Sequence, residues 1–398
     1  LLPVLADALD LRPDERAQVR YQIALWTVAS YGADSARRLA AVPDSAYDER
    51  LHEWQAREAM ARGDWAAARE AIRRMPPAYY AARMDEMTGK PDEARKLFTL
   101  AAKSPTFHGF LAADRIDAPY ALCPWTPEDS AAARAAVAAD PGLSRALALY
   151  RLSRPDWAVR EWSAALAKMD DTRRRLAVEA AQEAGWFDRA VFALGKTPDG
   201  QPRPDELRLY TLRFPLHHAD AIRREAARSG IDPTWVAAEI RAESVFDPNA
   251  RSAADARGLM QVVPATGAAI ARQLALPGYV DGSSLYDPDM NIAIGSAYLR
   301  QLLDRYGAPY IAMAAYNAGP GPAQRWLGQR PDHDADIWIE TVSYKETREY
   351  VARILAFSVL YDWRLNGNAL PVSERMLGQP SGTRKAFACP AVTTPSGL

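Results

Sequence analysis

The chain has 398 residues, with 49 Lys and Arg against 50 Asp and Glu, a formal net charge of -1 and 48% hydrophobic residues. This is the composition of a globular protein, and at roughly 100 to 200 residues per domain its length predicts two or three domains. The balanced charge argues against a protein that coats nucleic acid, because affinity for phosphate needs an excess of Lys and Arg.

Cysteine usage and hydropathy exclude further classes of protein. Cys123 and Cys389 form neither a disulfide scaffold nor a zinc site, since no second Cys or His lies at ligand spacing around either; whether they pair with each other stays open. No uncharged apolar run reaches the roughly 18 to 20 residues that a membrane span needs. The first residues, LLPVLADALD, lack an initiator Met and a basic region, so we expect any signal peptide to be absent from this chain.

The first half of the chain, to about Gly195, has apolar residues at helical spacing between short breaks, which predicts one helix after another. Gly suits the left-handed end of a helix, and Pro or Asp suits the start of the next one. Such paired helices stack into an α-solenoid; an ordinary helical bundle is the alternative. The breaks lie at 63–65, 89–91, 153–158 and 185–190.

A Gly- and Pro-rich stretch at 195–204 predicts a linker or a long loop. After it Gly, Pro, Asn and Tyr become frequent between shorter helices, which is typical of a compact domain with functional loops. We therefore expect an all-α fold in three parts: a superhelical domain at 1–205, a compact helical domain at 210–368 and a C-terminal tail at 369–398.

The segment that follows Asp232 is the most informative one. Asp232 is a good N-cap residue and is followed by proline, so the spacing predicts a helix over 233–244. On that helix Val236, Ile240 and Glu243 share the buried stripe. A partly buried carboxyl group near the negative end of a helix dipole is expected to have a raised pKa and to serve as a general acid. A Glu that pairs with one of the many Arg residues is the alternative.

Four motifs then follow in order: ES at 243–244, RGLMQVVPAT at 257–266, AAYNAGPG at 314–321 and ETVSYKETREYV at 340–351. Together they resemble the catalytic domain of the soluble lytic murein transglycosylases, periplasmic enzymes that cut the glycan strands of peptidoglycan. One such motif would be weak evidence, but four in the family's order are specific. The helical first half is similar to the superhelical part of the same family, with FHGFLAADR at 107–115 as its clearest segment.

The resemblance implies a lysozyme-like catalytic domain at 210–368 in which Glu243 is the single catalytic acid. Glu243 would protonate the glycosidic oxygen between N-acetylmuramic acid and N-acetylglucosamine, and would then act as base on the C6 hydroxyl. The product would be a 1,6-anhydro sugar, formed without water.

Two alternatives stay open. An ordinary glycosidase needs a second carboxylate, and the obvious local candidate, Asp247, precedes proline and fits a loop or cap residue better. A hydrolytic muramidase like goose-type lysozyme, with Asp247 or Asp255 assisting water, is nevertheless possible. So is a non-catalytic scaffold that binds peptidoglycan.

The same resemblance implies substrate contacts from hydroxyl, amide, carboxylate and aromatic side chains. As a second carboxylate, Glu340 could also help to raise the pKa of the acid. The implied contact residues are Ser252, Gln261, Tyr316, Asn317, Glu340 and Tyr344.

Three positions depart from the family pattern. Asp255 stands where Gly is common, Val263 where Met is common and Ser343 where Pro is common. None of them removes the acid, so they bear on subsite preference more than on activity. Asp255 also leaves open whether the loop keeps the family's backbone.

The resemblance implies peptidoglycan strands as substrate, the periplasm of a Gram-negative bacterium as location, and cell-wall synthases or penicillin-binding proteins as candidate partners. We expect a monomer with no cofactor, metal, nucleic acid or membrane span. The adjacent pair His217 and His218 is a poor metal site, because neighbouring side chains at a helix start point in different directions.

Overall fold

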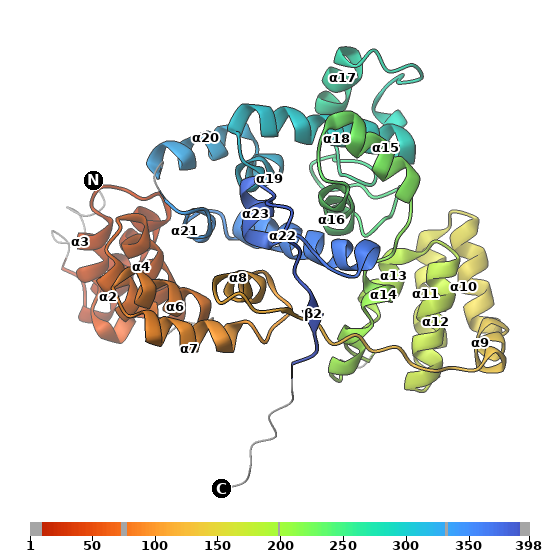
Figure 1. Cartoon of the computed structure of the whole chain (residues 1–398), viewed down its shortest axis with the longest axis horizontal. Coiled ribbons are helices and arrows are strands. Elements are labelled where there is room, and N and C mark those ends of the chain that lie inside the picture. Colours follow the sequence, from red (N-terminus) through yellow and green to blue (C-terminus); the bar gives the residue numbers. More distant parts are fainter. Residues whose placement is uncertain (1–9, 73–77, 198–199, 331–332, 391–398) are drawn as a thin grey trace, which may run out of the picture. The chain divides into compact units, whose positions relative to one another are not determined.

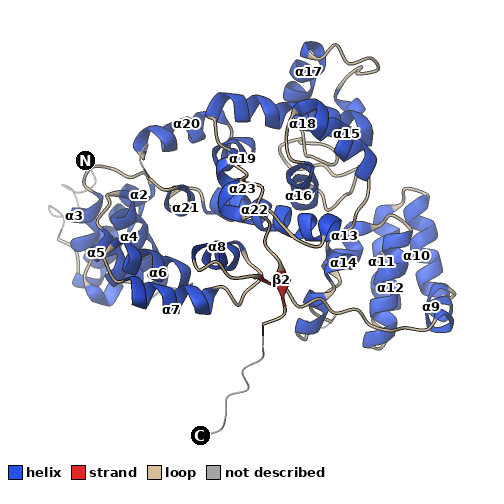
Figure 2. Ribbon diagram, in the orientation of Figure 1, coloured by secondary structure: helices blue, strands red, loops and turns tan. Residues whose placement is uncertain are grey.

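The computed structural model describes residues 10–72, 78–197, 200–330 and 333–390. This part of the chain is helical almost throughout, which confirms the all-α prediction (Figures 1 and 2). Its two named strands, β1 (Tyr120–Ala121) and β2 (Phe387–Ala388), pair in parallel. Residues 1–9, where a signal peptide would be sought, and residues 391–398 of the predicted tail lie outside the described residues.

The chain divides into two compact units. The first unit comprises Leu1–Ala121, Leu302–Ala356 and Leu370–Ala388, and the second comprises Leu122–Gln301, Phe357–Ala369 and Cys389–Leu398. Two long helices, α18 (Pro288–Tyr306) and α22 (Lys345–Asn366), run through the boundaries.

The first unit contains helices from both ends of the sequence. They are α2 (Pro13–Ala29), α3 (Ser35–Ala40), η1 (Asp44–Ala46), α4 (Glu49–Ala61), α5 (Trp65–Ile72), α6 (Ala78–Met87), α7 (Pro91–Ala101), α8 (Phe107–Arg115), α19 (Pro309–Ala318), α20 (Pro320–Gln329), α21 (Ala335–Glu340) and α23 (Val372–Leu377).

The second unit contains the middle of the sequence. Its elements are α9 (Ala131–Ala138), α10 (Pro141–Arg151), α11 (Pro155–Leu166), α12 (Asp171–Glu183), α13 (Phe187–Phe192), η2 (Pro204–Arg208), α14 (Tyr210–Arg213), α15 (Ala219–Ser229), α16 (Pro233–Glu243), α17 (Pro264–Gln273) and η3 (Gly282–Tyr286).

The four predicted breaks are turns between helices that pack against each other: α4 with α5, α6 with α7, α10 with α11 and α12 with α13. Each turn contains one residue with a left-handed backbone, and three of these are glycines, which adopt it without a steric penalty. Their φ angles are 72° at Gly63, 76° at Gly89, 54° at Ser153 and 78° at Gly185. The sequence prediction of paired helices is therefore confirmed.

The predicted break at 195–204 is a short loop with an antiparallel bridge between Lys196 and Pro202; residues 198–199 lie outside the described part. Glu206 closes the loop, because it accepts a hydrogen bond from the Gly195 amide at 2.9 Å and pairs with the buried Arg174. Charge compensation thus anchors a segment that has little apolar surface of its own.

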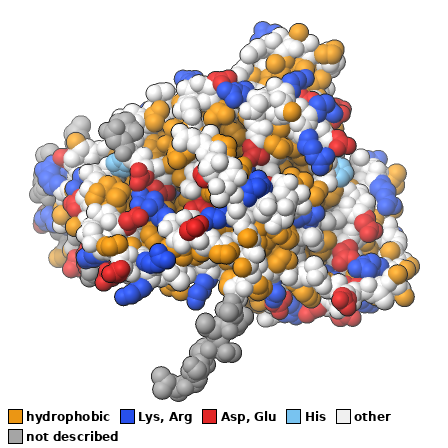
Figure 3. All heavy atoms as spheres, viewed as in Figure 1, with side chains coloured by type: hydrophobic (Ala, Val, Ile, Leu, Met, Phe, Trp, Pro, Cys, Tyr) orange, Lys and Arg blue, Asp and Glu red, His pale blue; other side chains and the backbone are white. Residues whose placement is uncertain are grey.

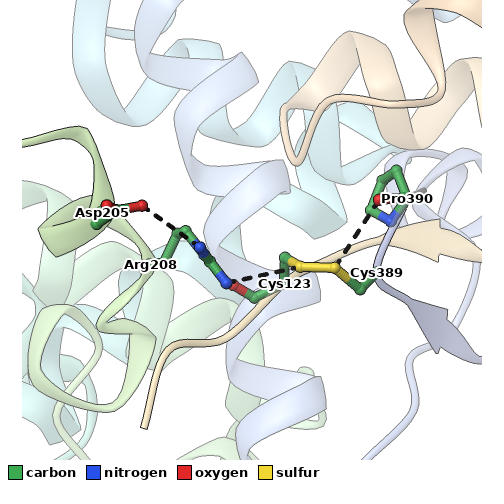
Figure 4. The surroundings of a disulfide bond; sticks show 5 residues. All are labelled: Cys123, Asp205, Arg208, Cys389 and Pro390. Carbon is green, nitrogen blue, oxygen red and sulfur yellow. Dashed lines mark hydrogen bonds and ion pairs between the residues drawn. A yellow bond between two sulfur atoms is a disulfide. The ribbon is translucent and has the colours of Figure 1, made fainter. Parts of the chain in front are cut away.

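The cysteines, whose pairing the sequence left open, form a disulfide across 266 positions (Figure 4). Beside it Arg208 Nε donates a hydrogen bond to the Cys123 carbonyl oxygen at 2.9 Å. Together with α23 and β2, the disulfide fixes the described part of the predicted tail, so this part packs onto the protein.

Surface charges of both signs are interspersed on the face drawn in Figure 3, as expected for a nearly neutral chain. Within the described residues no helix is long and apolar enough to cross a membrane.

Candidate functional site

Glu243 is the last residue of α16, the helix predicted from the sequence. Asp232 caps its start as predicted, since its Oδ1 accepts a hydrogen bond from the Thr234 amide at 2.8 Å. Val236 and Ile240 are fully buried, whereas Glu243 is partly exposed. The helix therefore buries its apolar stripe and presents the carboxyl group at the edge of that stripe.

The residue after Glu243 connects two of the motifs. Ser244 is buried, and its hydroxyl donates a hydrogen bond to the carbonyl oxygen of Leu259 at 2.7 Å. Leu259 belongs to the GLMQ segment, so the end of α16 is tied to the loop that carries Gln261. This contact explains why a small hydroxyl residue follows the Glu.

The chain turns sharply just beyond. Val245 and Phe246 have φ angles of 51° and 63°, a left-handed conformation that is costly for a β-branched or bulky residue. Both side chains are buried, and the Phe246 ring lies 5.9 Å from Phe187 and 6.4 Å from Tyr361, centre to centre. Aromatic packing holds the strained turn in place directly after the predicted acid.

Gln261, a predicted substrate contact, has a structural role that its sequence position did not reveal. Its Nε2 donates hydrogen bonds to the carbonyl oxygens of Ala250 at 3.0 Å and Gly258 at 2.9 Å. The amide hydrogens therefore hold the loop together. Any contact of this side chain with a ligand would come from its carbonyl oxygen.

Asn291 on α18 is important for the same loop and was missed by the sequence analysis. It is fully buried, its Oδ1 accepts from the Met260 amide at 2.8 Å, and its Nδ2 donates to the carbonyls of Arg257 at 2.9 Å and Leu285 at 2.8 Å. A Cβ on Gly258 would lie 2.1 Å from the Leu285 oxygen, so only glycine fits there. No signal near Asn291 in the sequence marks this role, because its partners are distant along the chain.

Ser252 lies in the loop between these motifs and is exposed. Its Oγ accepts a hydrogen bond from the Ala256 amide at 3.1 Å, so its own hydroxyl hydrogen can be donated to a ligand.

Asp255 has a left-handed backbone, with a φ angle of 62°, a conformation that glycine adopts without a steric penalty. Its carboxylate pairs with Arg257 at 2.9 Å and Arg251 at 2.6 Å, and these hydrogen bonds, led by that from Arg257, lower the pKa of Asp255. The two ion pairs thus tie the side chain of this left-handed residue to its neighbours in the loop.

Asp247, the local candidate for a second carboxylate, has the geometry of a loop cap. Its Oδ1 accepts a hydrogen bond from the Asn249 amide at 2.9 Å. Burial raises its pKa, and the nearby carboxylate of Asp188 adds to this effect.

The other predicted contacts lie in the first unit. Tyr316 and Asn317 are near the end of α19 and are both partly exposed. Thr347 at the start of α22 donates a hydrogen bond from its hydroxyl to Asn317 Oδ1 at 2.6 Å. This bond orients the Asn317 side chain so that its amide nitrogen is the end available to a ligand.

Tyr344 is 48% exposed and rests edge-on against Trp326, with ring centres 5.1 Å apart. Trp326 is in turn fixed by a hydrogen bond from its Nε1 to Ser343 Oγ at 3.2 Å. Ser343, which stands where the family commonly has Pro, therefore supports the ring that supports Tyr344. An exposed aromatic ring on a rigid base is suited to stacking on a sugar face.

Glu340, the last residue of α21, is paired with Arg57 on α4, and both side chains are largely buried.

The predicted residues therefore fall into two groups. The first group lies around one connected loop of the second unit: Glu243, Ser252 and Gln261. The second group lies in the first unit: Tyr316, Asn317, Glu340 and Tyr344. In the described part of the chain no group of three His, Cys, Asp or Glu side chains is arranged to hold a metal ion.

Comparisons with known proteins bear on both halves of the chain. Residues 220–339 match the model of the transglycosylase SLT domain, and residues 136–198 match that of the soluble lytic murein transglycosylase L domain. The chain is 28% identical over 378 residues to the soluble lytic murein transglycosylase of Escherichia coli K12, and the match covers 91% of this chain and 56% of the relative.

Two solved structures have similar folds. An inactive Glu-to-Gln mutant of the lytic transglycosylase Slt from Pseudomonas aeruginosa matches with a TM-score of 0.80 at 29% identity, over 93% of this chain and 61% of that one. The 70 kDa soluble lytic transglycosylase of Escherichia coli matches with a TM-score of 0.79 at 27% identity, over 92% and 59%. The chain thus spans little more than half the length of its relatives.

Proposed function

We propose that this chain, a homologue of the soluble lytic murein transglycosylases that carries matches to their SLT and L domains, is a lytic murein transglycosylase. It would cleave the β-1,4 bond between N-acetylmuramic acid and N-acetylglucosamine in peptidoglycan without adding water. The observation that carries the proposal is the position of Glu243, which is partly exposed at the end of a helix that Ser244 ties to the GLMQ loop.

In this mechanism Glu243 acts twice. As an acid it gives its proton to the glycosidic oxygen, so that the leaving sugar departs as a neutral alcohol. The resulting carboxylate then takes the proton of the C6 hydroxyl, whose oxygen attacks C1 and closes the 1,6-anhydro ring. The proton count balances, and Glu243 ends the cycle protonated. A relative that became inactive when a Glu was replaced by Gln supports a carboxyl group in this role.

The hydrolytic alternative would need a second carboxylate to activate water. Asp255 is engaged by Arg251 and Arg257, and Asp247 caps its own loop, so both local carboxylates already have structural partners. This favours the route in which the substrate supplies the nucleophile. The remaining binding residues, Ser252, Gln261, Tyr316, Asn317, Glu340 and Tyr344, are proposed to hold the sugar rings and their acetamido groups.

The proposal is tested by digesting purified sacculi and measuring the masses of the products. We expect 1,6-anhydro ends, which are lighter by one water than reducing ends. Glu243→Gln should lower the rate by at least roughly 100-fold, because the proton donor is lost, while binding to glycan persists. Glu161→Gln, which changes a partly exposed carboxylate on α11, is the matched control and should keep wild-type activity. Reducing ends on every new product, or an active Glu243→Gln protein, would refute the proposal.

We also propose, on the resemblance to the family, that the chain acts in the periplasm as a monomer. The helical segment at 1–205 would support the glycan strand, the segment at 210–368 would carry the chemistry, and 369–398 would form a C-terminal tail. Cell-wall synthases and penicillin-binding proteins are the partners to test, by pull-down with the purified chain.

A further inference from the structure

Arg57 and Glu340 form an ion pair inside the first unit although 283 positions separate them in the sequence. Arg57 comes from α4 and Glu340 from the end of α21, and these two helices pack against each other. Only 8% of the Arg57 side chain and 13% of the Glu340 side chain are exposed. Water and salt therefore screen this pair much less than a pair on the surface.

The geometry of the pair is one-sided. Both Nε and Nη2 of Arg57 lie 2.9 Å from the same oxygen of Glu340, Oε1. The common fork-to-fork arrangement of Arg and carboxylate uses both oxygens. Here Oε2 stays outside these two contacts, and its lone pairs can accept a hydrogen bond from another donor.

Arg57 is itself held on α4. Its Nη1 donates to Glu53 Oε2 at 2.9 Å, and its guanidinium lies over the Trp54 ring, 5.6 Å from the centre. Burial lowers the pKa of Arg57, but the attraction of Glu340 and Glu53 outweighs this effect and raises it overall. The Arg57 guanidinium is therefore charged and held in place, and Glu340 binds to it.

We propose that Arg57 is a positioning residue of the glycan site: it fixes Glu340 through Oε1 and leaves Oε2 to accept a hydrogen bond from a sugar hydroxyl or an acetamido N–H. This inference rests on the proposed function, because it takes Glu340 as a substrate contact. It gives the helical first half of the chain a direct part in recognition. It also makes Glu340 a charge-compensated acceptor and not a base that activates water.

The test is a double-mutant cycle on soluble glycan strands, with kcat and KM measured for Arg57→Gln, Glu340→Gln and the double variant. Each single variant should raise KM by roughly tenfold, the size expected for losing a hydrogen bond to a charged group. The value of kcat should change by less than about threefold, and the double variant should be no worse than the poorer single variant, because both changes remove one interaction. Arg57→Lys keeps the positive charge, so its KM should lie between those of the wild type and of Arg57→Gln.

Arg69→Gln is the matched control, since Arg69 makes a similar pair with the buried Asp85, through contacts of 2.6 and 2.9 Å. It should lower Tm and leave KM unchanged. Additive KM effects in the cycle, or an Arg57→Gln protein that loses only thermal stability, would overturn the inference. If Glu340→Gln leaves KM unchanged, the inference fails on its own, while loss of activity in Glu243→Gln would still support the proposed reaction.

Discussion

At the scale of single residues, Asp247 illustrates how a carboxylate beside the proposed acid can serve the backbone. It lies four positions after Glu243, caps the turn at Asn249 and is partly buried. Burial disfavours its charged form, so the pKa of Asp247 in the folded protein lies above its ordinary value. At any pH at which Asp247 is ionised in the folded protein, its buried charge lowers the free energy of unfolding.

The variant Asp247→Asn tests this interpretation. Asn keeps the oxygen that accepts from the Asn249 amide and removes the charge, so we expect a higher Tm than wild type at neutral pH. The gain should shrink as the pH falls through the folded-state pKa, because the wild-type carboxyl then becomes neutral as well. Tm measured between about pH 3 and pH 8 checks the sign. A fall in cleavage rate would instead support the water-activating role of the hydrolytic alternative.

At the scale of secondary-structure elements, α16, α18 and the GLMQ loop form one hydrogen-bonded assembly. Ser244 joins the end of α16 to the loop, and Asn291 joins α18 to backbone groups of the loop and of its neighbour η3. The side chains of Leu259 and Met260 in this loop are buried, and the polar contacts hold the backbone that carries them.

Replacing Asn291 by Ala should therefore be severe. It removes the hydrogen bonds that Asn291 makes with the Met260 amide and with the carbonyls of Arg257 and Leu285, and we expect a loss of about 3 kcal/mol in the free energy of unfolding. Urea unfolding measures this loss. Asn249→Ala, which changes an exposed Asn in the same region, is the control and should change stability by less than about 0.5 kcal/mol. Equal effects of the two variants would contradict the proposed role of Asn291.

At the scale of the whole chain, the disulfide between Cys123 and Cys389 closes a loop of 266 positions. In the chain-entropy account a cross-link over so long a loop restricts the unfolded state strongly, and the stabilisation is roughly 2 to 5 kcal/mol. β1 and β2, the only named strands in the described residues, pair immediately before the two cysteines.

Reduction of the disulfide in the wild-type protein should therefore lower its Tm. The variant Cys389→Ser should have this lower Tm without any reducing agent, and adding one should not change it. Thermal unfolding with and without dithiothreitol measures both effects. If reduction leaves the Tm of the wild type unchanged, the disulfide contributes little to the stability of the folded state.

The sequence predicted the helical elements well where the signals were local. The cap at Asp232, the buried stripe of α16 and the turns at Gly63 and Gly185 depend on a few neighbouring residues, and each is confirmed. The domain boundaries and the substrate contacts stay predictions. The sequence did not predict that the Gln261 amide holds its own loop, because Ala250 and Gly258 come into reach only when that loop has folded.

The amino-acid sequence by itself determined the helix type, several helix ends and the resemblance that makes Glu243 the candidate acid, because periodicity, capping and motifs are properties of short segments. Only the tertiary structure decided that the cysteines pair, that Asn291 organises the GLMQ loop and that Arg57 holds Glu340. These contacts join residues from 31 to 283 positions apart. Pairings over such distances follow from how the helices pack, which no local pattern of residues specifies.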